Sequence, residues 1–236
     1  MIREASEIRA RLRQLADKNT AKVLQAFFKT GPGEYGEGDV FIGIKVPPLR
    51  MLAKECEEAP LKTLKALLMS KIHEERTLAL MILVRQFERG SERMREQIYN
   101  FYLAQTRFIN NWDLVDGSAP YIAGPFLWER DRKPLYVLAR SASLWEKRIA
   151  ILATFYFIRR NDFADALKIS KLLLADEHDL IHKAVGWMLR EIGKRDTAAA
   201  ESFLKAHYRK MPRTMLRYAI ERFPEARRRK YVLGQI

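Results

Sequence analysis

The stretch "RTLALMILVRQFERG", residues 76–90, decides the fold class because its apolar side chains recur with the period of a helix. Gly90 follows the last of these side chains and predicts the end of that helix. Further segments with helical periodicity are residues 6–17, 20–30, 61–70, 143–160, 164–177, 179–196, 198–210 and 214–223. No segment shows convincing alternation of apolar and polar residues, which would indicate a strand. We therefore predict an all-α protein.

Similar positions recur at a fixed interval along the chain. Arg76, Trp112, Arg148 and Ala184 are each separated by 36 residues, and each lies near the start of a predicted helix. A two-helix repeat of about this length is typical of an α-solenoid, and the consensus residues of tetratricopeptide repeats are absent. We predict one HEAT-like repeat domain over residues 1–236, with a concave basic face. The alternative is an irregular helical domain with chance spacing.

Residues 31–48 interrupt the helical pattern with a connection rich in glycine and proline. Gly31, Gly33, Gly36 and Gly38 exclude a helix, whereas Pro47 and Pro48 suit the first turn of the next one. A phosphate-binding loop is a poor interpretation because the segment lacks the GK[ST] sequence and its acidic side chains would repel a phosphate. These acidic residues are Glu34, Glu37 and Asp39. We expect a structural connection.

The charge of the chain favours a polyanionic partner. Lys and Arg number 43 against 29 Asp and Glu, a formal net charge of +14, and nucleic acid is the commonest polyanion that a protein meets. Residues 205–230 hold ten of these cations and only two glutamates, and include Arg213 and Arg217. A generally basic, solvated surface is the alternative interpretation. Because no signal peptide or membrane span stands out, we expect a cytoplasmic protein associated with the bacterial nucleoid.

Several kinds of catalytic centre find no support in the sequence. It contains no HExxH, GxSxG or Walker motif. His178 and His182 are one helical turn apart, but no third metal ligand accompanies them, so we expect capping or surface histidines and no metal site. Cys56 is the single cysteine. Its acidic neighbours would raise the pKa of its thiol, and we expect it to be inert.

Large and charged side chains at equivalent repeat positions are the remaining candidates for a site. Trp112 and Asp116 are four residues apart and would project from one face of a helix. The alternative is a core tryptophan beside a solvated aspartate. Arg148 opens a helix that is apolar nearly all round, so it must pair with a carboxylate or face a polar groove. Lys183, Trp187 and Arg190 share one helical face.

These residue types together suit cleavage of the N-glycosidic bond of an alkylated purine. The guanidinium of Arg148 would hold phosphate, and the indoles of Trp112 and Trp187 would stack against the sugar or base. A purine methylated at N3 or N7 leaves as a neutral base, so its departure needs little acid catalysis. The developing oxocarbenium ion needs an anion close to the sugar. Asp116 is our candidate for that anion. We expect Asp113 to support the helix N-terminus behind Asn110 or Asn111.

Three blocks of sequence resemble the AlkD-type DNA alkylation repair family, the DNA glycosylases built from HEAT-like repeats. The first is "FFKTGPGEYGEGDVFIGIKVPPLR", residues 27–50, and the second is "NWDLVD", residues 111–116. The third combines "LWEKRIAIL", residues 144–152, with "AVGWMLREIGK", residues 184–194. Together these blocks are specific, and the resemblance extends over most of the chain.

The resemblance implies a monomeric DNA repair enzyme that excises positively charged N3- and N7-alkylpurines from duplex DNA, without a cofactor and without deep base flipping. It implies Asp116 as the catalytic carboxylate, Trp112 and Trp187 as aromatics against the lesion nucleotide, and Arg148 as a phosphate ligand. DNA contacts at Lys183, Arg190, Arg213 and Arg217 are inferred from charge alone. The alternative is a non-catalytic HEAT-like module that binds damaged or branched DNA. A scaffold for protein partners would predict a neutral or acidic face, which the charge of +14 opposes.

Overall fold

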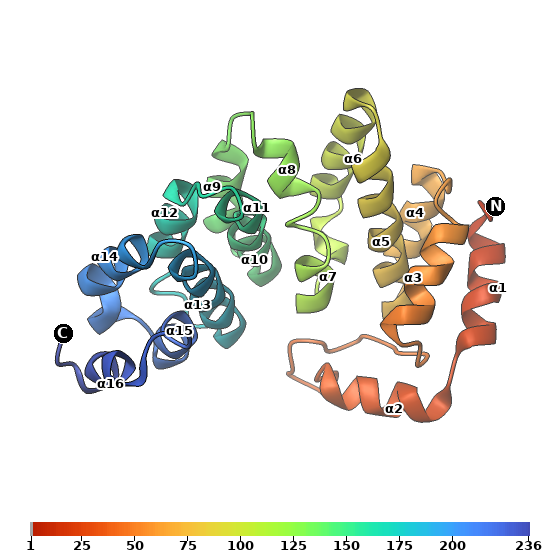
Figure 1. Ribbon diagram of the computed structural model, residues 1–236. Coiled ribbons are helices and arrows are strands. Elements are labelled where there is room, and N and C mark those ends of the chain that lie inside the picture. Colours follow the sequence, from red (N-terminus) through yellow and green to blue (C-terminus); the bar gives the residue numbers. More distant parts are fainter. Residues whose placement is uncertain (1) are drawn as a thin grey trace. The chain divides into compact units, whose positions relative to one another are not determined.

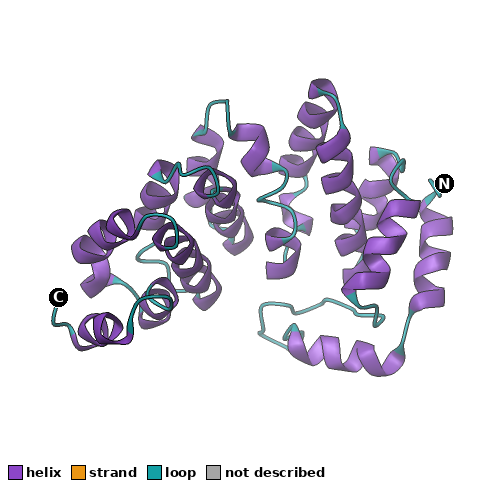
Figure 2. Cartoon of the chain, in the orientation of Figure 1, coloured by secondary structure: helices purple, strands orange, loops and turns teal. Residues whose placement is uncertain are grey.

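Helices account for the regular structure throughout residues 2–236, the part of the chain that the computed structural model describes. Within these residues, the one pairing of β type is an isolated parallel bridge between Val40 and Ile72, and Figure 2 shows only helices and loops. The predicted all-α fold class is confirmed. None of the described helices is both long and apolar enough to cross a membrane.

The chain forms two compact units, Met1–Ile122 and Ala123–Ile236. Each unit is described by itself below. The prediction of one continuous domain with a concave basic face therefore stays a prediction.

The first unit is organised around the long helix α5. Its helices are α1 (Ala5–Leu15), α2 (Lys18–Phe27), α3 (Val46–Glu55), α4 (Leu61–Leu68), α5 (His73–Arg89), α6 (Glu92–Ala104), the 3₁₀ turn η1 (Thr106–Phe108) and α7 (Trp112–Asp116). Helices α3, α4, α6 and α7 all contact α5 (Figure 1). Leu78, Ile82 and Leu83 of α5 are fully buried between them. Gly90 follows the last residue of α5, as the sequence predicts.

The connection between α2 and α3 is fixed by a buried carboxylate. The side chain of Glu74, in the first turn of α5, accepts hydrogen bonds from the backbone amides of Ile42, Gly43 and Ile44, with the Gly43 bond at 2.8 Å. Three successive amides around one carboxylate form a nest for an anion. The connection ends at Lys45, because α3 begins at Val46 with prolines in its first turn.

The second unit is organised around α13. Its elements are α8 (Ala123–Leu127), α9 (Lys133–Ala139), α10 (Leu144–Ala153), α11 (Phe155–Ile158), α12 (Ala164–Leu172), α13 (Asp179–Gly193), α14 (Thr197–His207), η2 (Tyr208–Lys210), α15 (Arg213–Ala219) and α16 (Glu225–Leu233). Helix α13 packs against α10, α14 and α15. Gly186 permits the close approach to α15, because a Cβ there would lie 2.5 Å from the Cβ of Tyr218.

One prediction about helix boundaries is wrong. The single helix expected over residues 143–160 is broken at Thr154 into α10 and α11. The Thr154 hydroxyl donates to the carbonyl of Ile151 at 2.6 Å, and Gly124 of α8 packs against the carbonyl of Ala153 where the helix ends.

Candidate functional site

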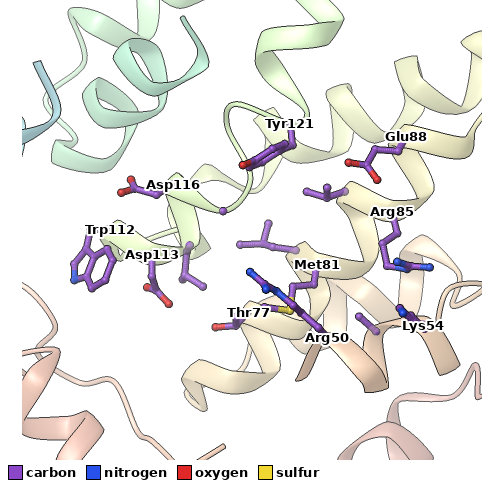
Figure 3. Close-up of a pocket in the computed structure, with 15 residues that line it drawn as sticks. Arg50, Lys54, Thr77, Met81, Arg85, Glu88, Trp112, Asp113, Asp116 and Tyr121 are labelled. Carbon is purple, nitrogen blue, oxygen red and sulfur yellow. The ribbon is translucent and has the colours of Figure 1, made fainter. Parts of the chain in front are cut away.

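The short helix α7 presents two candidate residues on the same side. Asn111 caps its N-terminus, with the side-chain oxygen accepting from the backbone amide of Trp112 at 2.8 Å. The amide of Gly117 closes the last turn on the carbonyl of Asp113. Trp112 and Asp116 project from one side of this helix in Figure 3, whereas Asp113 projects from another. The predicted shared face of Trp112 and Asp116 is therefore present.

Trp112 is the outer member of an aromatic cluster. Its ring stacks on Phe28 at a centroid distance of 5.2 Å and meets Phe27 edge-on at 6.0 Å. Phe28 is buried, Trp112 is half-buried and Phe27 is 61% exposed. The alternative interpretation of Trp112 as an ordinary core residue does not fit this position, because the indole retains a solvent-facing surface.

A groove of about 550 Å³ lies between α3, α5 and α7. Its wall includes Trp112, Asp113 and Asp116 from α7, together with Tyr121 just beyond that helix (Figure 3). The apolar part of the lining is formed by Leu80, Met81, Val84 and Leu114. An apolar groove with a few polar groups at its edge is the usual form of a ligand site.

Cationic side chains line the same groove. Arg50 and Lys54 of α3 are exposed and form no salt bridge with any residue between 2 and 236. Arg85 of α5 is held by Glu57 at 2.7 Å, so it contributes less free charge. Two unpaired cations beside an indole and a carboxylate produce a groove that attracts an anionic backbone.

A buried polar network lies beneath α7. The ring of His73 contacts two carboxylates: its Nδ1 is 3.0 Å from Asp39 and its Nε2 is 2.8 Å from Asp113. Arg76 donates to the other oxygen of Asp39 at 2.6 Å, and the side-chain amide of Asn111 donates to Asp39 at 3.2 Å. As expected, Asn111 is the cap and Asp113 lies in the first turn of α7, and the carboxylate of Asp113 also contacts His73 of α5.

The network shifts two pKa values in opposite directions. Burial by itself would lower the pKa of His73, but hydrogen bonds to Asp113 and Asp39 outweigh burial and raise it. Burial would raise the pKa of Asp39, yet the hydrogen bond from His73 and the charge of Arg76 lower it. Both shifts favour the charged forms of His73 and Asp39.

In the second unit, Arg148 is buried rather than displayed. Its side chain lies in α10, the residue is 4% exposed, and Nη1 donates to the carbonyl of Leu180 at 2.5 Å. The expectation of a carboxylate or a polar groove beside Arg148 stays a prediction. The contact with Leu180, at the start of α13, gives Arg148 a structural role in joining the two helices.

The candidate residues of α13 have partners within their own unit. Lys183 pairs with Asp179 at 2.7 Å, the indole nitrogen of Trp187 donates to Glu191 at 3.2 Å, and Arg190 is paired with Glu221. Arg213 and Arg217 of α15 are exposed. These partners leave the cations on the surface, but each ion pair lowers the charge that the helix offers to DNA.

Two other predictions concern residues outside the site. His178 caps α13 by accepting from the amide of Leu180, and His182 contacts the carbonyl of Asp176. Burial first, and then the charge of Glu55, raises the pKa of the Cys56 thiol to about 11, which supports the expectation of an inert cysteine.

Sequence reasoning missed the residues that hold α7 and those that line the groove opposite it. His73, Asp39 and Arg76 form the first set, and Arg50 and Lys54 form the second. One signal was available: His73, Glu74 and Glu75 are polar residues at the start of an otherwise apolar helix, and all three are buried. Buried polar groups need partners, and these partners come from distant segments.

The all-helical fold and a groove that combines an indole, a carboxylate and unpaired cations suit a helical protein with a polyanionic partner. Comparison with known protein families supports a partner of this kind. The profile of the family described as "DNA alkylation repair enzyme" matches residues 8–223. The chain therefore belongs to this family, whose description implies an enzyme that acts on DNA.

Solved structures with the same fold include proteins from two bacteria. A predicted DNA alkylation repair enzyme from Enterococcus faecalis has a TM-score of 0.69 and 18% identity, covering 89% of this chain and 97% of that one. AlkD2 from Streptococcus mutans has a TM-score of 0.54 and 17% identity, covering 94% of this chain and 100% of that one. These similarities confirm the predicted helical-repeat fold class. No curated protein matches the chain.

Proposed function

We propose that the protein is a monofunctional DNA glycosylase that excises positively charged N3- and N7-alkylated purines from duplex DNA. The observation that carries this proposal is the placement of Trp112 and Asp116 on one side of α7, lining a groove that also holds Arg50 and Lys54. A protein that only binds DNA gains nothing from a carboxylate in a cation-lined groove, because the carboxylate repels the backbone.

The proposed reaction breaks the bond between C1′ of the sugar and the purine nitrogen. The bonding electrons stay with the alkylated purine, which leaves as a neutral base and needs little acid catalysis. Positive charge then develops on the sugar, where the carboxylate of Asp116 stabilises it. Water bonds to C1′ and loses a proton to complete the hydrolysis.

The proposed binding of DNA divides between side chains that contact phosphate and side chains that contact sugar. Arg50 and Lys54 contact phosphates at the groove, and the exposed part of the Trp112 indole packs against the lesion nucleotide. In the second unit, Trp187 and Arg148 are the DNA-contacting residues that the family resemblance implies. Lys183, Arg190, Arg213 and Arg217 add contacts with phosphate. The protein acts as a monomer and without a cofactor in this proposal.

The proposal is tested by incubating the protein with duplex DNA that contains one N7-methylguanine. We expect release of free N7-methylguanine, measured by chromatography, and an abasic site that heat or alkali converts into a strand break. The control is the same duplex with unmodified guanine, which should release no base. Binding of the modified duplex without base release would instead support a non-catalytic DNA-binding module.

Replacing Arg148 separates its structural contact from its proposed phosphate contact. Because the carbonyl of Leu180 loses a charged donor, we expect Arg148→Met to lower the free energy of unfolding by about 1–3 kcal/mol in urea denaturation. A phosphate contact would also make the plot of log binding constant against log salt shallower by about 1. The matched control is Arg140→Met, since Arg140 is exposed and donates to the carbonyl of Tyr136. An unchanged salt slope would restrict Arg148 to its structural role.

A further inference from the structure

Both ring nitrogens of His73 face carboxylate oxygens. Nδ1 is 3.0 Å from Asp39 and Nε2 is 2.8 Å from Asp113. An ionised carboxylate only accepts hydrogen bonds, so both contacts are satisfied only when both ring nitrogens carry a proton. The short bond from Arg76 to the second oxygen of Asp39 keeps that carboxyl ionised. His73 is therefore an imidazolium in this arrangement.

The charges of the network balance only when His73 is protonated. The cations Arg76 and His73 face the anions Asp39 and Asp113, in a space where the side chain of His73 is 3% exposed. Glu74 is the other carboxylate beside them, and its oxygens face the amides of residues 42–44. Removing the proton would leave one unbalanced negative charge in a buried site, which is costly.

Two hydrogen bonds of the network and one ring contact hold the first turn of α7. Asp113 accepts from His73, and Asn111 donates to Asp39 while it caps the amide of Trp112. Phe28 contacts both the His73 ring, at 5.0 Å, and the Trp112 ring, at 5.2 Å. A helix of five residues has too few internal hydrogen bonds to be stable by itself. Its position therefore depends on these outside contacts.

We propose that His73 is the positioning residue of the site: as an imidazolium between Asp39 and Asp113, it holds α7 so that Trp112 and Asp116 face the groove. The proposal rests on the proposed function in so far as Asp116 is the reacting carboxylate. His73 itself does not touch DNA, because it lies beneath α7 and is buried.

Loss of the His73 proton weakens one of the two carboxylate contacts, because an unprotonated ring nitrogen cannot donate. Asp113 is the partner on the outer side, with 22% of its side chain exposed, whereas Asp39 is held by Arg76 and Asn111 as well. Nη2 of Arg76 lies 3.3 Å from Nδ1 but already donates to Asp39, so Asp39 is fixed beside that nitrogen. Asp113 can withdraw from an unprotonated Nε2, so its contact is released first and α7 loses this hydrogen bond to α5. The expected consequence is loss of base release at alkaline pH.

The sign of the pH effect follows from the raised pKa of His73. The stability that His73 contributes is fully present below the unfolded value of about 6.5 and is lost as pH rises through the folded value. Protonation of His73 is not expected to reduce stability or the rate of base release at acidic pH.

The experiment compares three variants of the full chain with the wild type. His73→Gln removes the cation, and His207→Gln is the matched control on the second unit. Asp113→Asn should keep the contact between α7 and His73 at alkaline pH. Its amide can donate to the unprotonated Nε2 of a neutral imidazole while Nδ1 still donates to Asp39. Single-turnover base release and DNA affinity are measured from pH 6 to 10, and the protonation of His73 is followed by ¹⁵N NMR without DNA.

We expect the rate of base release to fall at alkaline pH in the wild type and to the same extent in His207→Gln. His73→Gln should lose about 10- to 100-fold in rate, by analogy with residues that orient the ligands of metal sites. Its rate should also no longer fall at alkaline pH, while its DNA affinity is nearly unchanged. Asp113→Asn should keep most of its activity at alkaline pH, and its His73 should lose the proton at lower pH than in the wild type.

Several outcomes would overturn the proposal. These are an alkaline limb that persists in His73→Gln, an Asp113→Asn protein as slow as His73→Gln, or a neutral His73 ring at pH 7. The fluorescence of Trp112, identified by comparison with Trp112→Phe, should change as His73 titrates, and a constant signal would also contradict the proposal. A wild type that releases no base but shows the NMR and fluorescence transitions would defeat the proposed function and leave the positioning role standing.

Discussion

Asp116→Asn is expected to reduce the single-turnover rate of N7-methylguanine release by about 10²–10³-fold, the cost of removing one well-placed charge-stabilising group. The substitution keeps the shape of the side chain and removes its charge, so the developing oxocarbenium ion loses its counter-ion. DNA affinity should stay equal or rise, because the carboxylate repels phosphate in the ground state. An effect on rate without a loss of affinity is the signature of an interaction made in the transition state.

Glu88→Gln is the matched control for this experiment. Glu88 lies on α5 and lines the same groove, so the control removes one negative charge from the same surface (Figure 3). We expect its rate of base release to stay close to that of the wild type. Equal losses in both variants would mean that the overall charge of the groove matters rather than Asp116, and full activity in Asp116→Asn would remove this residue from the mechanism.

Local periodicity was enough to predict the fold class and the shared face of Trp112 and Asp116. Helical spacing is a short-range property, since residues three and four apart lie on the same side of any helix. The 36-residue interval could also be found, because Arg76, Trp112, Arg148 and Ala184 all lie near the starts of helices. Such features need no knowledge of which helices pack together.

Features that depend on packing between distant segments could not be predicted. His73 lies 34 residues from Asp39 and 40 from Asp113, and no local pattern links them. The break at Thr154 lies where Gly124, which belongs to another helix, approaches the carbonyl of Ala153. Arg148 illustrates the same limit. Its apolar helix showed that it needed a polar partner, but no local pattern indicates that the carbonyl of Leu180, 32 residues away, is among its partners.

Gly43→Ala is expected to lower the free energy of unfolding by at least about 3 kcal/mol, measured by urea denaturation. Gly43 has φ +87°, which costs about 1–2 kcal/mol for a residue with a Cβ. A Cβ there would also lie 1.9 Å from the carbonyl oxygen of Asp17 and 2.6 Å from the amide nitrogen of Ala21, both of them backbone atoms. Relief of that overlap requires the loop to move away from the start of α2.

Gly38→Ala separates the two causes, because Gly38 has φ +86° but no atom within 4 Å of the position of a Cβ. Gly38→Ala should lower the free energy of unfolding only by the conformational strain of about 1–2 kcal/mol. The excess in Gly43→Ala then measures the packing of the loop on α2. That movement would also pull the Gly43 amide from Glu74, whose neighbour His73 holds α7. We therefore expect Gly43→Ala, but not Gly38→Ala, to slow base release, and equal stability of the two variants would contradict this packing argument.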